Sequence, residues 1–175
     1  MLYRQFQYTT PWALRGGEPL KRITLRIIGT VRNRVRKMKR EGWESVVSDV
    51  IIDPRLEEAL GGIEDYSHLL VLFWLSRVKK GQRNLKKIHP KSREDLPLVG
   101  IFATRTQYRP NPIGLTVVKL IRRKKNILQV RGLDALNRTP VVDIKPISPR
   151  QEFLEEPSVP KWYDQLWRGS KGQRG

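Results

Sequence analysis

Short β-type segments separated by turn residues constrain the fold of this chain more than any other feature. Seven runs are rich in apolar and β-branched residues. Residues 69–75 are continuously apolar, so we expect this run to be buried on both faces. Only one short helix is predicted, over residues 54–60, because proline suits a first helical turn and Gly61 and Gly62 would end it. The other six runs are residues 23–31, 46–52, 99–104, 115–121, 127–132 and 140–144.

This pattern predicts a mainly β fold with a few short helices. Many short strands favour an antiparallel or mixed barrel or sandwich. A doubly wound sheet is disfavoured, because the strands do not alternate regularly with helices. The Gly-rich dinucleotide fingerprint is absent as well. Any nucleotide-like cofactor must therefore be held in another way.

The length of 175 residues suits one domain with a sizeable core. Residues 1–20 contain Pro and Gly without clear periodicity and are predicted to form a flexible extension, whereas residues 21–150 form the β domain. In the tail, residues 151–175, we expect the aromatic part to dock on the body and the last seven residues to be disordered. No targeting segment is visible, and the longest apolar run is far below the roughly 20 residues that span a bilayer.

The balance of charge points to an acidic partner. The chain carries 35 Lys and Arg against 17 Asp and Glu, a formal charge of +18. Nucleic acid is the commonest soluble partner of such a surface, although a solvated face is the alternative interpretation. The lack of cysteine excludes disulfides and thiolate sites and fits a cytoplasmic protein. With only two histidines, a metal site would have to rely on carboxylates, and we predict none.

Residues 100–116, GIFATRTQYRPNPIGLT, are the most informative stretch. Two prolines flank Asn111 and fix the local backbone, which stiffens a loop that also carries Arg105 and Arg109. A rigid loop with arginine and asparagine between two strands is typical of a small-ligand pocket. The alternative is a tight turn with incidental arginines.

Two further stretches carry candidate polar residues. Asp134 lies in the loop of GLDALNRTPVVDIKP, where it could accept hydrogen bonds from a cofactor ribose or amine, or simply serve as a turn residue. Asp143 and Lys145 share one strand face and could form a surface pair. His68 precedes the apolar run and is more typical of a core or turn histidine than of a base.

Taken together, three segments resemble the TsaA-like (TrmO-type) methyltransferases. They read GIEDYSHLLVLFW, GIFATRTQYRPNPIGLTVVKL and LDALNRTPVVDIKP, and the resemblance covers residues 23–149. It implies an S-adenosylmethionine site on a single β-barrel and a homodimer with composite active sites. It also implies methylation of the exocyclic amino nitrogen of threonylcarbamoyl-adenosine in the tRNA anticodon loop.

The resemblance also implies roles for particular residues. Asp134 and the backbone carbonyls of its loop are the candidate acceptors for the proton that leaves the amino group. Arg109 could pair with the substrate carboxylate, and Asn111 lies beside it in the same loop. Cofactor contacts are implied for Ser76, Arg77, Arg105, Leu115, Leu133, Asp134, Ala135 and Leu136.

RNA phosphates are expected to meet two basic clusters, within residues 32–40 and 77–91. The second contains the lysine cluster Lys79, Lys80, Lys86 and Lys87, which we expect to lie outside the cofactor pocket. Trp43 and Tyr108 could stack on bases or pack in the core.

The chain departs from the family pattern at three places. The early loop RNRVRKMKREGWESVVSD lacks a Pro-Arg-Gln segment, Asn137-Arg138 replaces Asp-Gly before Thr-Pro, and Ser76 stands where the family often has histidine. These departures leave two alternatives open: a methyltransferase of the same fold acting on another RNA or a small molecule, and a non-catalytic RNA-binding barrel.

Overall fold

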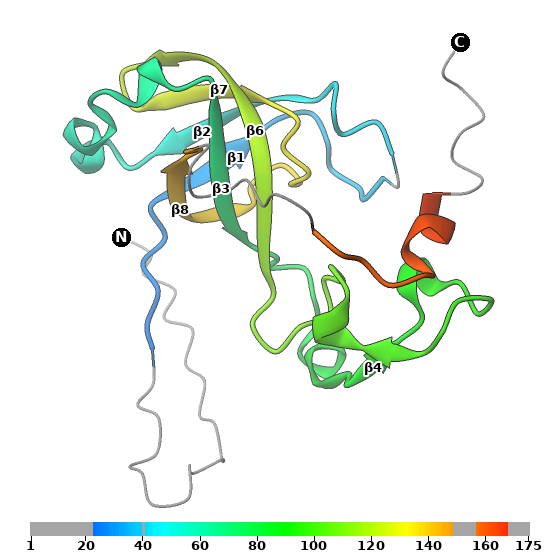
Figure 1. Ribbon diagram of the computed structural model, residues 1–175. Coiled ribbons are helices and arrows are strands. Elements are labelled where there is room, and N and C mark those ends of the chain that lie inside the picture. Colours follow the sequence, from blue (N-terminus) through cyan, green and yellow to red (C-terminus); the bar gives the residue numbers. More distant parts are fainter. Residues whose placement is uncertain (1–22, 40, 149–156, 168–175) are drawn as a thin grey trace, which may run out of the picture.

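The computed structural model describes residues 23–39, 41–148 and 157–167. Six antiparallel strands close a barrel in the order β1-β2-β7-β6-β3-β8 (Figure 1). The described helical segments are all short 3-10 turns. A mainly β barrel with little helix is therefore confirmed. Its strands are β1 (Gly29–Arg32), β2 (Val47–Ile52), β3 (His68–Trp74), β6 (Ile113–Lys124), β7 (Ile127–Arg131) and β8 (Pro140–Pro146).

A long connection joins β3 to β6 and lies outside the barrel wall (Figure 1). We refer to residues 75–112 as the β3–β6 connection. It contains a small separate sheet, formed by β4 (Lys87–Ile88) and β5 (Val99–Gly100). Its three 3-10 turns are η4 (Lys80–Asn84), η5 (Pro90–Ser92) and η6 (Ile101–Ala103).

The barrel interior is filled by side chains. Alternate residues of each strand point inward, and Val50, Leu69, Val71 and Leu128 are fully buried there. On β6, Gly114 lies opposite Phe73, and a Cβ at this glycine would stand only 2.3 Å from the Phe73 ring. The glycine therefore makes room for the largest core side chain, and the packed interior leaves no space for a ligand.

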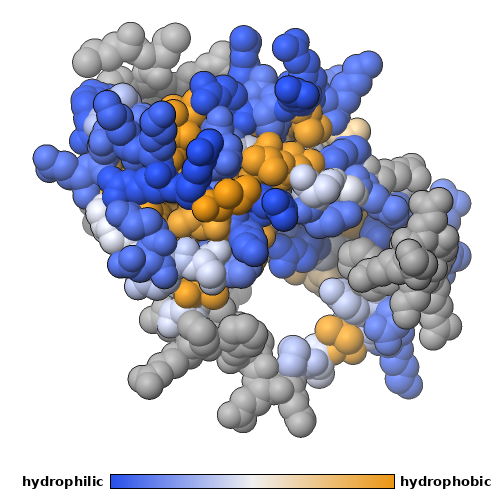
Figure 2. Space-filling view, turned by 90° about the horizontal axis from the view of Figure 1, so that it is seen from above, coloured by the Kyte–Doolittle hydropathy of each residue, from blue (hydrophilic) through white to orange (hydrophobic). Residues whose placement is uncertain are grey.

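Burial of β3 on both faces was predicted, and this prediction is wrong. Leu69, Val71 and Phe73 are buried, whereas the outward-facing Leu70 and Leu72 are only half-buried. The reason is that a barrel wall has one inner and one outer face. On β6, Val117 and Leu115 pair with Leu70 and Leu72 and are 55% and 44% exposed. This set of four forms an apolar outer face. Seen from above, the surface is largely hydrophilic, with hydrophobic residues gathered mainly in its middle (Figure 2).

Three other predicted elements are shorter than the sequence indicated. The first strand begins at Gly29 instead of residue 23, because β8 pairs with it only at Gly29 and Thr30. Residues 99–104 contribute only β5, followed by η6, and do not join the barrel. The predicted helix over residues 54–60 is two 3-10 turns, η1 (Pro54–Leu56) and η2 (Glu58–Leu60). Two more turns are η3 (Ile63–Asp65) and η7 (Tyr163–Trp167).

The described part of the tail lies against the β3–β6 connection (Figure 1). The Lys91 ammonium donates to the carbonyl of Leu166 at 3.0 Å, and Arg93 Nη1 donates to the carbonyl of Gln165 at 2.6 Å. The predicted extension over residues 1–20 and the predicted disorder over residues 169–175 lie outside the described residues. Within the described ranges, no helix has the length and apolar character needed to cross a bilayer.

Candidate functional site

A pocket of about 330 Å³ opens at one end of the barrel, and we name it the loop pocket. Four segments meet there: the segment that follows β1, the residues that follow β3, the end of the β3–β6 connection, and the loop between β7 and β8. Its lining comprises Met38, Leu75, Ser76, Arg77, Val78, Lys79, Gln82, Gln107, Tyr108, Asp134, Ala135, Leu136 and Thr139. The structure thus brings five of the predicted cofactor residues together around one cavity, namely Ser76, Arg77, Asp134, Ala135 and Leu136.

Asn33 fixes the β7–β8 loop, although the sequence did not single it out. Its side-chain Nδ2 donates to the carbonyl of Ala135 and to the hydroxyl of Ser48, both at 2.9 Å. Its own backbone N–H donates to Asn137 Oδ1 at 3.1 Å. Ala135 and Ser48 are 2% and 1% exposed, so water cannot easily replace these bonds. Asn33 looks like one polar residue in a charged run, but its Oδ1 also accepts from Val35 N–H, a local turn that asparagine favours.

Asp134 presents its carboxylate at the mouth of the pocket. The hydroxyl of Thr116, on the inner face of β6, donates to Asp134 Oδ1 and sets the orientation of the carboxylate. A carboxylate offers about four lone-pair sites, so this bond leaves acceptor capacity for a ligand. Thr116 was not recognised from the sequence, because a threonine in a strand is ordinary β composition.

The lining of the same pocket also carries positive charge. Arg77 Nη1 donates to the carbonyl of Arg36 at 2.7 Å, which ties the end of β3 to the segment that follows β1. Lys79 also lines the pocket. The expectation that all four lysines of the cluster lie outside the cofactor pocket is therefore wrong for Lys79.

Several predicted residues do not line the loop pocket of the same chain, among them Arg105, Arg109, Asn111, Leu115 and Leu133. Leu133 is fully buried in the core. Arg105 lies outside and donates to the carbonyl of Leu115 at 3.0 Å. Arg109 Nη1 donates to the carbonyls of Ile101 and Thr104 at 3.3 and 2.8 Å, so this guanidinium braces its own loop.

Asn111 is exposed in the same loop, and its carbonyl accepts from Ile113 N–H at 2.8 Å. Asp143 forms the expected surface pair with Lys145 at 3.0 Å. Trp43 is half-buried, with its indole N–H donating to the carbonyl of Lys39. Tyr108 lines the loop pocket.

Arg138 occupies one of the positions at which the chain departs from the family pattern. Its φ of +67° lies in the left-handed region, where glycine has no steric cost, and its N–H donates to the carbonyl of Val31 at 2.7 Å. The turn that closes the β7–β8 loop is thus a position where the family's glycine fits more easily than arginine.

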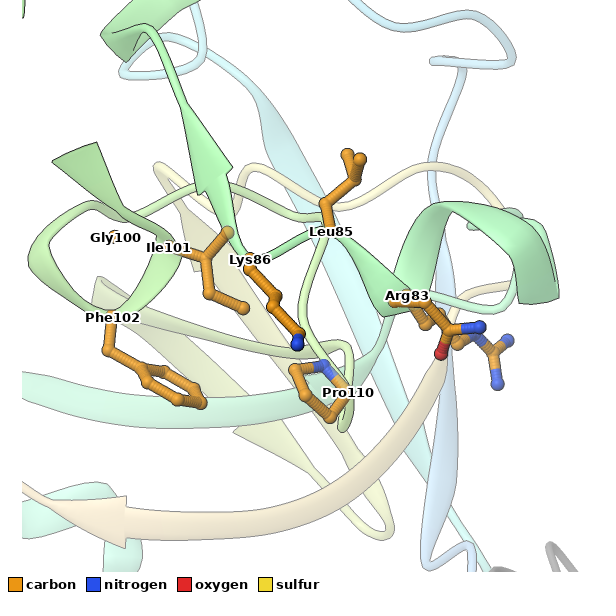
Figure 3. Close-up of a pocket in the computed structure, with 8 residues that line it drawn as sticks. Arg83, Leu85, Lys86, Gly100, Ile101, Phe102 and Pro110 are labelled. Carbon is orange, nitrogen blue, oxygen red and sulfur yellow. The ribbon is translucent and has the colours of Figure 1, made fainter. Parts of the chain in front are cut away.

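A second pocket of about 470 Å³ lies in the β3–β6 connection (Figure 3). We name it the Phe102 pocket. The two pockets are neighbours. In η4, Gln82 lines the loop pocket and the next residue, Arg83, lines the Phe102 pocket. Likewise, Tyr108 lines the loop pocket and Pro110 lines the Phe102 pocket. The lining of the Phe102 pocket comprises Arg83, Asn84, Leu85, Lys86, Gly100, Ile101, Phe102 and Pro110. Among the described residues, no three His, Asp or Glu side chains are grouped so that they could hold a metal ion.

The fold and the site define a closed antiparallel β-barrel domain with a filled interior and a pocket of small-ligand size built from its end loops. Residues 36–152 match the family model described as the tRNA-methyltransferase O N-terminal domain, and the chain belongs to this family. The resemblance seen in the sequence is therefore confirmed.

Two relatives from Archaeoglobus fulgidus match most of the chain. One, a probable S-adenosyl-L-methionine-binding protein, is 41% identical over 153 residues, which is 85% of this chain and 40% of that protein. The other, an S-adenosyl-L-methionine-binding protein, is 36% identical over 138 residues, covering 77% of this chain and 96% of its own length. The chain thus spans less than half of the first relative and nearly all of the second.

A tRNA (adenine(37)-N6)-methyltransferase from Escherichia coli K12 is 37% identical over 106 residues, 58% of this chain and 45% of that protein. The fold is also that of TrmO from P. aeruginosa, with a TM-score of 0.65 at 26% identity over 81% of this chain and 62% of that one. A further TrmO structure has a TM-score of 0.63 at 30% identity, covering 77% and 61% of the two chains.

Proposed function

We propose that the chain binds S-adenosylmethionine in the loop pocket and transfers its methyl group to an adenine of tRNA. The main support is the loop pocket itself, which gathers Ser76 and Arg77 with the segment 134–136. The family resemblance implies cofactor contacts for both segments, although they lie far apart in the sequence. The names of the relatives agree with this ligand and this reaction.

The residues around the pocket suit each part of this cofactor. Leu75, Val78 and Leu136 offer apolar surface for an adenine ring. The Asp134 carboxylate can accept hydrogen bonds from ribose hydroxyls or from the cofactor's ammonium group. Arg77 can pair with the cofactor carboxylate. The volume of about 330 Å³ falls in the range of small-ligand pockets.

When bound, S-adenosylmethionine supplies an electrophilic methyl group on its sulfonium. The protein's contribution is to align a weak amino nucleophile and to accept its proton. Asp134 is the acceptor that we assign, because Thr116 holds its carboxylate at the pocket mouth. We assign the adenine N6 amino group as the methyl acceptor, by analogy with the named relatives.

Within tRNA, the nucleoside that we propose as the substrate is threonylcarbamoyl-adenosine in the anticodon loop. Its threonylcarbamoyl group adds a carboxylate, which a cation at the pocket rim would recognise. Arg109 was the expected partner, but its guanidinium braces its own loop outside this pocket. We assign this pairing to Lys79, which lines the pocket. A tRNA substrate also agrees with the expectation that the protein is cytoplasmic.

Asp134→Asn tests this assignment. The variant keeps the shape of the side chain but removes its charge, so methyl transfer should fall at least tenfold while the fold is retained. Isothermal titration with S-adenosylmethionine and mass spectrometry of nucleosides from treated tRNA measure the two steps. Asp143→Asn, on the outer face of β8, is the matched control. Full methyl transfer by Asp134→Asn would refute its role.

The two alternatives give other results. Cofactor binding with a methylated product other than N6-modified adenine would indicate a different substrate. An absence of cofactor binding by the unaltered protein would favour a non-catalytic RNA-binding barrel.

The RNA backbone is proposed to dock on the β3–β6 connection. This segment carries ten Lys or Arg residues and only two acidic residues. Neutralising Lys80 and Lys87, which line neither pocket, should weaken tRNA binding and flatten its salt dependence without changing cofactor affinity. Neutralising Arg122 and Lys124 at the far end of β6 serves as the control. Equal losses in the two double variants would show that only net charge matters.

We also propose a homodimer whose active site uses both chains. The apolar outer face defined above gives a surface that a second copy could cover. Leu115 belongs to this face, and Arg105 donates a hydrogen bond to its carbonyl. Neither residue lines the pocket of its own chain, so both could complete the pocket of a second copy. Light scattering together with mixing of Arg105→Ala and Asp134→Ala proteins tests this, because mixed dimers would regain one intact site. A monomer at micromolar concentration would refute it.

A further inference from the structure

The most exposed aromatic ring of the β3–β6 connection has no role in the site described above. Phe102 is 74% exposed at η6, and it does not line the loop pocket. A ring that is this exposed contributes little to the core, so its surface is available to a ligand.

The Phe102 ring is nevertheless held in place. The Arg109 guanidinium carbon lies 5.4 Å from the ring centroid, within the range of a cation–π contact. That guanidinium is itself fixed by the carbonyls of Ile101 and Thr104. The ring is therefore pre-oriented while most of its surface stays open, as a stacking platform requires.

The space beside the ring suits a flat, partly apolar group next to a negative charge. Figure 3 shows the Lys86 side chain extending toward the Pro110 ring, with Ile101 and Phe102 on the same side, whereas Leu85 points away. The pocket volume of about 470 Å³ is that of a small-ligand site. Lys86 places positive charge at its edge, as a nucleotide phosphate would need. The Arg83 guanidinium is instead held by the carbonyl of Val78.

We propose that the Phe102 pocket binds a second unpaired base of the RNA substrate, stacked on the Phe102 ring, beside the base that enters the loop pocket. The proposal rests on the RNA substrate of the proposed function. Charge complementarity identifies the occupant, because the surrounding connection is strongly basic and an aromatic ring within a basic surface is the usual combination for single-stranded nucleic acid. The shared turn η4 sets the two bases close together on the strand.

Binding of an RNA hairpin with a tRNA anticodon-arm sequence tests this proposal, with a loop-free duplex of the same stem as the second probe. Phe102→Ala should weaken hairpin binding about tenfold, the loss expected for one stacking partner, and leave duplex binding unchanged. Phe102→Trp should restore hairpin affinity. Leu98→Ala is the matched control, because Leu98 is 53% exposed in the same connection and lines neither pocket.

A fluorescent 2-aminopurine at successive loop positions gives a direct readout. One position should be quenched by the unaltered protein and by Leu98→Ala but not by Phe102→Ala. Equal affinities of the alanine variants would overturn the proposal, as would equal losses on hairpin and duplex or a loss of dimer in Phe102→Ala. If the unaltered protein methylates tRNA and Phe102→Ala has no effect, only this proposal fails. If the unaltered protein binds no hairpin, the proposed function fails with it.

Discussion

Replacing Asn33 with alanine removes the side chain that ties three parts of the barrel end together. Three hydrogen bonds are lost, to the carbonyl of Ala135, the hydroxyl of Ser48 and the N–H of Val35, each 2.9 Å long. A net hydrogen bond contributes about 0.5–1.5 kcal/mol, and two of these partners are buried. We therefore expect the free energy of unfolding to fall by about 2–3 kcal/mol.

The same substitution should weaken cofactor binding, although Asn33 does not line the loop pocket. Without the bond to Ala135, binding must order the segment 134–136, at a cost of about 1 kcal/mol. This cost corresponds to a roughly fivefold rise in the dissociation constant of S-adenosylmethionine. Urea denaturation gives the stability change, and isothermal titration below the unfolding transition gives the affinity.

Asn126→Ala separates the two effects. Its side chain donates to the carbonyl of Ile52 at 2.6 Å, at the opposite end of the barrel. This control should lose about 1 kcal/mol of stability and bind the cofactor normally. If Asn33→Ala and Asn126→Ala bind with the same affinity, the β7–β8 loop does not depend on Asn33. If neither substitution changes the free energy of unfolding, these hydrogen bonds make no net contribution to stability, and the expected loss for Asn33→Ala is refuted.

Three further changes test other parts of the structure. Gly114→Ala should destabilise by about 1–3 kcal/mol in urea, because its Cβ would overlap the Phe73 ring, whereas Gly81→Ala, which meets nothing within 4 Å, should not. Arg138→Gly should stabilise by about 0.5–1 kcal/mol in the same assay by relieving a positive φ, and a similar gain in Arg138→Ala would contradict this reason. Hydrogen bonds from Arg55 lower the pKa of Asp53 from 3.8 to about 2. The carboxylate therefore favours the fold above about pH 4, a contribution lost as the pH falls toward 2, and NMR titration of Arg55→Ala should show the pKa returning toward 3.8.

The strands of the barrel could be predicted because half-buried strands leave a local signature. Residues 46–52 and 127–132 match β2 and β7 almost to the residue. Closure could not be predicted in the same way, since it depends on pairing between β1 and β8, more than 100 residues apart. The apolar run 69–75 led to a wrong prediction for a related reason. A continuous apolar run is typical of a strand that is buried on both faces, but it also occurs in a strand with one buried face and one apolar surface face.

Site residues could be predicted from the sequence where they directly follow a strand, because the end of the strand determines where they lie on the barrel. Ser76 and Asp134 follow strands that end at the same rim of the barrel, so they meet. Side-chain direction was not predictable. Arg109 lies in the expected loop, yet its guanidinium turns back to carbonyls of that loop. Phe102 lies in an apolar run that predicted a strand, and its exposure follows from η6, a local turn that interrupts the run.

The packed interior also determines where chemistry can occur in this fold. Because side chains fill the barrel, every ligand must bind to its loops, and loops hold a ligand well only when their backbones are fixed. Here side chains do the fixing: Asn33 holds Ala135, Arg77 holds Arg36, and Arg109 holds Thr104. Two of these three are cations that the sequence suggested as ligand contacts. Replacing Arg77 or Arg109 with lysine keeps the positive charge but removes the planar guanidinium with its several N–H donors. Such a variant should therefore disturb the pockets even though the surface potential is unchanged.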